Sequence, residues 1–459
     1  MNDRLWSYAP YRPAGAADEI YICRLAPAEE SIHIEWLGDD KVYEIYYRVR
    51  GTGDFVLHGH CEKNAYDLDG LQTDTEYEFF VKSQDRKSVV RLARAGKCEG
   101  VVVNYLHPED TAYAFSGHCL ASPSLVRLPD GALLASMDVY AKSAPQNHTL
   151  IFRSTDEGES WHYLSELHPC FWGKLFLHKG ELYMLACSTE FGDLLIGKST
   201  DGGKTFGAPT VIARGKAAGK DGYHRAPQNI LLHNGRLYTS YEWGVRPSPK
   251  EKTAFTVGVL SCDAASDLLN AENWRVSAPQ TLDPAWVPEV TDVTPLTATI
   301  EGTMAVWPDG KLTDILRFEC AAAKVIAYQV GEDPAAPVQF DRTVDFPAGH
   351  SKFEILQDEE GRYYSVATRY FENGERTARS RPPRNLLSLL VSDDLAEWRI
   401  ARDLIDYRDR DMNKHGFQYV DFIFSGEDIL YLCRTATNGA VDFHDSNYIT
   451  FHRIQNYKK

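Results

Sequence analysis

The sequence predicts an all-β fold: a small β-sandwich followed by a six-bladed β-propeller. In residues 19–100, strand-like runs recur at intervals of about ten residues, the spacing of a sandwich built from short strands. Small sheets repeated along the rest of the chain are typical of a propeller, whose blades each hold four strands. The repeating feature is a hairpin with a glycine in its turn, found around Gly131, Gly180, Gly235, Gly310, Gly361 and Gly426.

Residues 1–18 precede both regions. They are polar and hold several prolines and alanines, so we expect an arm that lies on the surface rather than a folded domain. The predicted division of the chain is therefore 1–18 for the arm, 19–100 for the sandwich and 101–459 for the propeller.

The sandwich region contains one recognisable motif, Leu71-Gln72-Thr73-Asp74-Thr75-Glu76-Tyr77. It resembles the L-x-P-x-T-x-Y corner of fibronectin type III domains, in which the tyrosine hydroxyl bonds back to the backbone. Thr73 stands where that motif has its proline. The resemblance implies a spacer or docking module, through which the chain could form oligomers, and implies no catalytic role.

Three short acidic segments follow strand-like runs of the propeller region: 154–161, 199–206 and 392–398. Each ends in an aromatic residue. They resemble the Asp box, S-x-D-x-G-x-[ST]-[WF], of the sialidase-like propellers; two copies are complete and the third is partial. We expect the box to be a folding device, in which the aspartate accepts hydrogen bonds from its own turn and the aromatic ring packs between blades.

The last blade offers three clear strands, at 418–424, 428–434 and 448–454. A propeller that stayed open there would leave unpaired strand edges. We therefore predict that residues 100–106 supply the fourth strand of this blade and close the ring.

Composition and charge exclude some classes of partner. The net charge of −16 argues against nucleic acid and anionic membranes, although a local cationic pocket could still bind an anionic sugar. The start of the chain has no apolar segment of signal-peptide type, and no run approaches the length of a membrane span. Nine cysteines without CxxC spacing fit reduced thiols in a cytoplasmic protein. We expect no cofactor and no metal ion.

The start of each inner strand and the end of the following strand should meet at one end of the propeller axis. Polar residues gather at these positions, and we expect a site there that takes an oligosaccharide or polysaccharide. The predicted catalytic candidates are Glu301, His350, His148 and His118. The predicted substrate-binding residues are Trp172, Lys174, Tyr223, His224, Arg225, Lys352, Gln418, Arg434 and His444.

The sialidase resemblance does not extend to every catalytic feature. Sialidases carry an arginine in R-I-P at the first inner strand, where this chain reads Ala121-Ser122-Pro123. Their acid/base aspartate has no counterpart in the loop 143–148. Their late Tyr–Glu nucleophile pair has no clear counterpart in the sequence: Tyr419 or Tyr448 could be offered, but neither lies in a recognisable motif. The sequence thus predicts the fold without sialidase activity.

Three functions remain open at this stage. An exo-acting glycoside hydrolase of acidic or uronic-acid-containing glycans would use Glu301 with a second carboxyl group, from Asp138, Glu242 or Asp421. A lyase would need a His or Tyr base and a cation that neutralises a uronic carboxylate. The third alternative is a glycan-binding propeller without catalysis.

Overall fold

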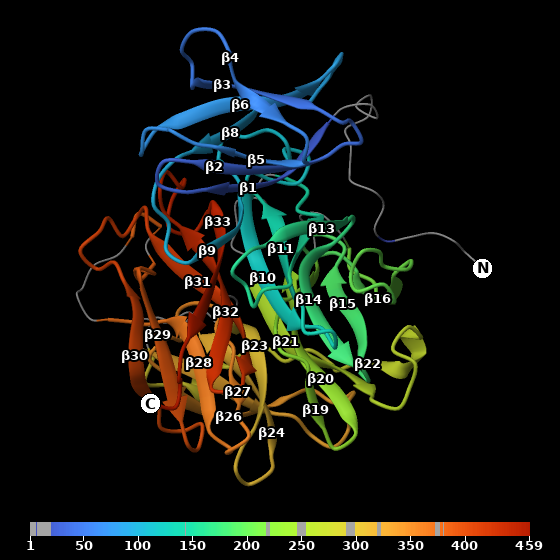
Figure 1. Ribbon diagram of the computed structural model, residues 1–459. Coiled ribbons are helices and arrows are strands. Elements are labelled where there is room, and N and C mark those ends of the chain that lie inside the picture. Colours follow the sequence, from blue (N-terminus) through green and yellow to red (C-terminus); the bar gives the residue numbers. More distant parts are fainter. Residues whose placement is uncertain are drawn as a thin grey trace.

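The computed structural model describes Trp6 and residues 20–142, 144–216, 221–245, 254–290, 299–318, 323–371, 377–379 and 381–459. Its first part contains two antiparallel sheets (Figure 1). One sheet has the order β1 (Tyr21–Pro27), β2 (Ile32–Leu37) and β5 (Ala65–Leu68). The other has the order β4 (Val56–Cys61), β3 (Tyr43–Val49), β6 (Glu76–Ser83) and β7 (Arg86–Lys87), with β8 (Arg91–Arg94) also paired to β6.

The two sheets share one hydrophobic core. Ile34 and Trp36 of the first sheet are buried in the same cluster as Ile45 and Phe79 of the second. Alternating residues of each strand point inward, so each sheet contributes one apolar face. The Tyr77 hydroxyl accepts a hydrogen bond from the Gln72 backbone N–H at 2.8 Å, a contact of the kind that the corner motif implies. The assignment to the fibronectin type III class stays a prediction.

Six antiparallel sheets follow along the described chain. Blade 1 holds β10 (Cys119–Arg127), β11 (Leu133–Tyr140), β12 (His148–Ser154) and β13 (His162–Leu167). Blade 2 holds β14 (Phe171–His178), β15 (Glu181–Cys187), β16 (Leu194–Ser199) and β17 (Thr210–Ala213). Blade 3 holds β18 (Gly222–His224), β19 (Leu231–His233), β20 (Arg236–Val245), β21 (Ala254–Asp263) and β22 (Trp274–Val276), with short 3₁₀ turns η1 (Ala271–Asn273) and η2 (Pro284–Trp286) nearby in sequence.

The second half of the ring repeats this pattern. Blade 4 holds β23 (Thr299–Val306), β24 (Leu312–Phe318), β25 (Lys324–Gln329) and β26 (Gln339–Asp345). Blade 5 holds β27 (Leu356–Gln357), β28 (Tyr363–Thr368), β29 (Leu386–Ser392) and β30 (Arg399–Asp406). Blade 6 holds β31 (Gly416–Ser425), β32 (Asp428–Ala436), β33 (Tyr448–Ile454) and β9 (Val101–Tyr105).

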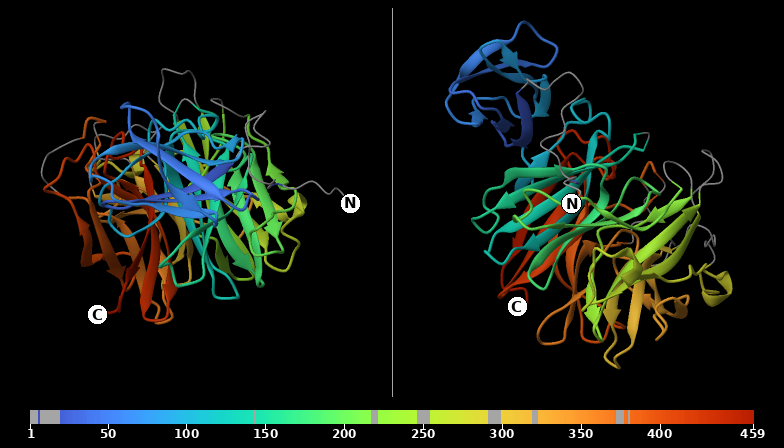
Figure 2. Two further views of the ribbon diagram at one scale, coloured as in Figure 1. Left: turned by 45° about the horizontal axis from the view of Figure 1, so that its top comes forward. Right: turned by 90° about the vertical axis from the view of Figure 1, so that its right-hand side faces the viewer.

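Strand β9 closes the ring, as predicted. It pairs antiparallel with β33, with Tyr105 opposite Tyr448 and Val101 opposite Phe451. The two N-terminal sheets, β1–β8, lie on the side of the propeller where β9 pairs with β33 (Figure 2). Arg24 of β1 fastens the two together, because its guanidinium donates to the carbonyl oxygens of Val103 at 2.8 Å and Val102 at 2.9 Å.

The three acidic boxes lie between the third and fourth strands of blades 1, 2 and 5. In the first, Asp156 Oδ1 accepts from the Ser160 N–H at 2.9 Å, and the Ser154 hydroxyl accepts from the Gly158 N–H at 2.9 Å. The second box repeats both contacts. Trp161 is fully buried and packs on Phe451 of blade 6. These hydrogen bonds confirm that the boxed aspartates serve their own turns.

One residue of the N-terminal arm corrects the prediction of a surface segment. Trp6 is 1% exposed and belongs to the core between blades 1 and 2. Its indole N–H donates to the Pro169 carbonyl at 2.8 Å, and its backbone N–H donates to the Phe206 carbonyl at 2.9 Å. A large aromatic side chain favours such a buried place, which the polar composition of the arm did not indicate. The rest of the predicted arm lies outside the described residues.

The inner strands of four blades share a backbone distortion. Each has a register shift that contains a residue with positive φ: Ser122, Trp172, Glu301 and Tyr419, with φ between 51° and 57°. Such bulges redirect side chains and are frequent beside active sites. In blades 4 and 6 the redirected residues are Glu301 and Tyr419, which meet each other.

Candidate active site on the propeller axis

The centre of the candidate site is a hydrogen-bonded tyrosine and glutamate. The Tyr419 hydroxyl donates to Glu301 Oε1 at 2.5 Å, and Arg317 donates to Glu301 Oε2 at 2.6 Å. All three side chains are largely buried, with Tyr419 8% exposed. The group hydrogen-bonded to Glu301 is therefore a tyrosine rather than a second carboxylate.

Two more arginines surround this pair. The Arg434 guanidinium lies 5.0 Å from the centre of the Tyr419 ring. Arg384 bonds to Gln418, the residue before Tyr419, and is 1% exposed. Among the described residues, the Nε–H groups of Arg384 and Arg434 are buried and have no hydrogen-bond acceptor. Arg153, Arg225 and Arg236 also have buried Nε–H groups without an acceptor, so what Arg384 and Arg434 bring to this site is their positive charge.

The charges of the site shift its pKa values in opposite directions. Burial would raise the pKa of Glu301, but Arg317, with His224 and the hydrogen bonds from Tyr419 and Arg317, lowers it to about 2. Burial, and then the charge of Glu301, raise the pKa of the Tyr419 phenol. Burial and the nearby Arg317 lower the pKa of Arg384 to about 9. At neutral pH the site therefore holds an ionised carboxylate next to a protonated phenol.

Glu242 orients the backbone of Glu301. Its Oε1 accepts the Glu301 N–H at 2.7 Å, and its Oε2 lies 2.6 Å from His224 Nδ1. Asp138 makes the same kind of contact in blade 2, where its Oδ2 accepts the Trp172 N–H at 2.7 Å. Two of the three predicted partner carboxylates, Glu242 and Asp138, thus support residues with positive φ instead of facing the carboxyl group of Glu301, and the third, Asp421, bonds to Lys174.

Several predicted binding residues do lie near the pair. Gln418 donates to the Phe443 carbonyl at 2.6 Å, and Arg434 donates to the His444 carbonyl at 2.5 Å. His444 Nδ1 lies 2.7 Å from Asp445. Burial and the neighbouring Arg434 lower the pKa of His444 to about 3. The rings of Trp172 and His224 lie 4.2 Å apart, at the end of blades 2 and 3.

Other predicted residues are engaged elsewhere. Arg225 is fully buried and donates to the carbonyl oxygens of Leu185 at 2.9 Å and Trp172 at 3.2 Å. Tyr223 packs on Trp243 at 5.0 Å. Lys174 and Lys352 belong to a buried cluster with Asp421 and Glu354. The side chains of these four residues are thus occupied by contacts with other groups of the protein.

The predicted histidines are dispersed. His148 is buried against Phe115 and lies 3.3 Å from Glu166, in a polar cluster with Tyr21 of β1. It faces the sandwich because it begins the third strand of its blade, not the inner strand. His118 Nδ1 lies 3.3 Å from the Asp110 carbonyl. His350 Nε2 lies 3.3 Å from the Pro383 carbonyl, near the segment that carries Arg384.

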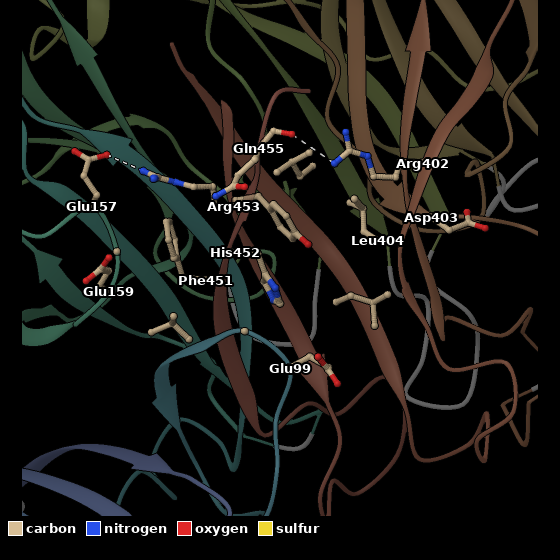
Figure 3. Close-up of a pocket in the computed structure, with 16 residues that line it drawn as sticks. Glu99, Glu157, Glu159, Arg402, Asp403, Leu404, Phe451, His452, Arg453 and Gln455 are labelled. Carbon is tan, nitrogen blue, oxygen red and sulfur yellow. Dashed lines mark hydrogen bonds and ion pairs between the residues drawn. The ribbon is translucent and has the colours of Figure 1, made fainter. Parts of the chain in front are cut away.

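A separate pocket of about 600 Å³ lies at the rim of the molecule between blades 5, 6 and 1 (Figure 3). Its lining includes Arg402, His452, Arg453 and Glu157, and none of the residues around Tyr419. Arg453 and Glu157 form an ion pair of 3.2 Å across it. Within the described ranges, no group of three or more His, Cys, Asp or Glu residues is arranged to hold a metal ion. No described helix is long and apolar enough to cross a membrane.

The fold has counterparts among solved structures. No protein family and no curated protein matches the sequence. The Hadza microbial sialidase Hz136 aligns with a TM-score of 0.51 and 12% identity, over 95% of this chain and 94% of that one. A Penicillium chrysogenum α-L-arabinanase, solved with arabinobiose, aligns with a TM-score of 0.49 and 17% identity, over 78% of this chain and 98% of that one. An ulvan lyase of family PL25 aligns with a TM-score of 0.46 and 11% identity, over 95% of each chain. The alignment with Hz136 shows that this chain has a sialidase-like propeller fold.

Proposed function

We propose that the protein is a glycoside hydrolase that acts on an acidic sugar, with Tyr419 as nucleophile and Glu301 as its base. The observation that carries the proposal is the 2.5 Å hydrogen bond from the Tyr419 hydroxyl to Glu301 Oε1. A phenol becomes a strong nucleophile when an adjacent base takes its proton, and tyrosine is among the side chains that form covalent intermediates.

The first step forms a bond from Tyr419 Oη to the anomeric carbon. The phenolic proton passes to Glu301, the bond from the anomeric carbon to the leaving oxygen breaks, and that oxygen takes a proton from water. In the second step, the hydroxide left by that water attacks the anomeric carbon, and the electrons of the broken bond return to Tyr419 Oη, which takes its proton back from Glu301. One water is consumed, and two displacements leave the anomeric configuration retained.

The arginines around the pair support an acidic substrate. Arg317, Arg384 and Arg434 place three guanidinium groups around Glu301 and Tyr419, and a carboxylate is the natural partner of such groups. Such a carboxylate would also offset the positive field that lowers the pKa of Glu301. Glu301 would then become a better base once the substrate is bound, because its pKa would rise towards the ordinary value.

The test is a panel of 4-methylumbelliferyl glycosides: α-N-acetylneuraminic acid, β-glucuronic acid, α-L-iduronic acid and the neutral α-L-arabinofuranoside. We expect turnover of an acidic member and none of the arabinofuranoside. The anomeric proton of the first-formed product, followed by NMR, should show retention. Oligosaccharides with a uronic acid linked through its O4 test for a lyase, whose product would carry an unsaturated uronic ring, and binding without turnover of either kind of substrate would establish a glycan-binding propeller.

A further inference from the structure

We propose that the buried charge cluster formed by Lys174, Lys352, Glu354 and Asp421 positions the nucleophile by holding the strand bulge that carries Tyr419. This inference rests on the proposed function, since it concerns how Tyr419 is presented to Glu301. The four residues are called the axial cluster below. They come from β14, from the segment leading into β27, and from β31. Each is at most 8% exposed.

The lysines of the axial cluster form hydrogen bonds with Val420 and Asp421, the two residues that follow Tyr419. Lys352 Nζ donates to the Val420 carbonyl at 2.7 Å. Lys174 Nζ donates to Asp421 and lies 3.3 Å from Glu354 Oε1. The other oxygen of Asp421 accepts the Leu125 N–H of β10 at 2.5 Å. The bulge of β31 is thus tied to blades 1, 2 and 5, directly beyond the residue with positive φ.

Glu301, the hydrogen-bond partner of Tyr419, is held by a carboxylate instead of a lysine. Glu242 accepts the Glu301 N–H, and Asp138 does the same for Trp172. In blade 5 the residue at the same distance beyond the turn glycine is Thr368, which donates to the Phe417 carbonyl at 2.6 Å. No carboxylate can therefore reach the bulge of β31 from that position. The hydrogen bond from Lys352 to the Val420 carbonyl holds the bulge of β31 instead.

Burying two lysines and two carboxylates away from water lowers the stability of the fold unless each charge is paired. The cost suits a site in which a fixed geometry matters, because a small misplacement of a reacting group lowers the rate strongly. The axial cluster also holds an extra proton: burial, and then the charge of Asp421, raise the pKa of Glu354 to about 8. Burial lowers the pKa of Lys352, and Lys174 adds to that effect.

Deprotonation of Glu354 should therefore weaken the hydrogen bond from Lys352 to the Val420 carbonyl. The charged groups facing Glu354 are Lys174 from β14, Asp421 from β31 and Lys352 from its own segment. A newly ionised Glu354 would draw Lys352 away from the carbonyl. The position of Tyr419 would then change as the pH rises through about 8, below the range in which its own phenol ionises, because burial raises that pKa.

The experiment labels the full-length protein with tyrosine carrying ¹³C at Cζ and identifies the Tyr419 NMR signal with a Tyr419→Phe variant. Lys352→Met should shift this signal in the folded protein. With the 4-methylumbelliferyl glycoside that the wild type hydrolyses, it should lower kcat by about 10²-fold while KM stays unchanged. Lys324→Met removes a partly exposed lysine paired with the exposed Asp345 and should change neither readout. A folded Lys352→Met protein with the wild-type Tyr419 signal overturns the proposal.

Glu354→Gln provides a second, isosteric test that does not depend on Lys352→Met folding. The wild-type Tyr419 signal should move as the pH rises through about 8, and the glutamine variant should lose this movement. A variant that keeps it overturns the coupling. Both NMR measurements are independent of turnover, so they decide the positioning role even if no glycoside is cleaved. If hydrolysis depends on Tyr419 but not on Lys352, the proposed function stands. The same result contradicts only the positioning role of the axial cluster.

Discussion

Tyr419 of blade 6 donates a hydrogen bond of 2.5 Å to Glu301 of blade 4, and both residues have positive φ at a register shift of their inner strand. Neither conformation is favoured for a residue with a side chain, so the surrounding structure must impose both. The two strained positions bring together a protonated phenol and an ionised carboxylate.

Tyr419→Phe should abolish turnover of the 4-methylumbelliferyl glycoside, with a loss of at least about 10²-fold, because the nucleophilic oxygen and its proton transfer disappear together. The phenyl ring keeps the contact with Arg434. Binding of the substrate, measured by calorimetry, should therefore persist. Retained turnover would exclude Tyr419 as the nucleophile.

Glu301→Gln should lower activity by about 10²- to 10⁴-fold, because the glutamine amide cannot accept the phenolic proton. It should also destabilise the fold, since the buried Arg317 loses the negative charge of its 2.6 Å partner. Breaking a buried ion pair costs about 3–5 kcal/mol. Because the folded protein lowers the pKa of Glu301 from 4.5 to about 2, this stabilisation is present above pH 4.5 and is lost as the pH falls towards 2.

Urea unfolding at pH 7 and pH 3 tests the second part of this prediction. The difference between wild type and Glu301→Gln should be larger at pH 7. The exposed Glu359→Gln should unfold like the wild type at both values. An equal difference at the two pH values would show that the charge of Glu301 does not stabilise the fold.

Asp314→Asn should stabilise the protein at neutral pH. Burial raises the pKa of Asp314 from 3.8 to about 8, so the folded protein keeps a proton that the unfolded chain releases. Stability therefore falls as the pH rises from about 4 to 8. Asparagine has no proton to lose, and the Ser240 hydroxyl can still donate to its oxygen, as it does to Asp314 at 2.8 Å. We expect a gain of at least about 1 kcal/mol at pH 7.5 and a smaller gain at pH 5. No gain, beside an unchanged Asp85→Asn surface control, would contradict the buried, protonated state.

Asp156→Ala and Asp201→Ala should each cost about 1–3 kcal/mol, because each leaves turn N–H groups without an acceptor. Hydrogen bonds from Ser160 lower the pKa of Asp156 to about 2, in keeping with its role as an acceptor. Glu159→Ala changes an exposed residue of the same turn and serves as the control. Turnover per folded molecule should stay unchanged, and a selective loss of activity would show that the boxes act in catalysis.

The blades could be predicted from the sequence because their signals are local. A hairpin around a turn glycine such as Gly131 and a box such as 154–161 each lie within about a dozen residues. The pairing of β9 with β33 joins distant parts of the chain, and it was predicted because the last blade offered only three clear strands. The site was only partly predictable. Glu301 was identified from its place at a strand start, since charged residues there face the axis.

Tyr419, Arg384 and the true place of His148 could not be predicted with the same means. Tyr419 meets Glu301 only because a register shift turns its side chain, and no local residue pattern announces a positive φ at a tyrosine. Arg384 lies in the connection before β29, outside the repeating hairpin. His148 begins a third strand, and the direction of its side chain depends on the packing of the sandwich against blade 1.

The pairing of β9 with β33 has a consequence for synthesis on the ribosome. β9 emerges before every other strand of the propeller, and its partner emerges after all of them. The nascent chain therefore carries an open strand edge throughout translation of the blades, a state prone to mispairing. The contacts of Arg24 with the carbonyl groups of Val102 and Val103 can form as soon as the sandwich has folded. A sandwich that folds first would therefore hold β9 in place through these two hydrogen bonds before β33 is synthesised.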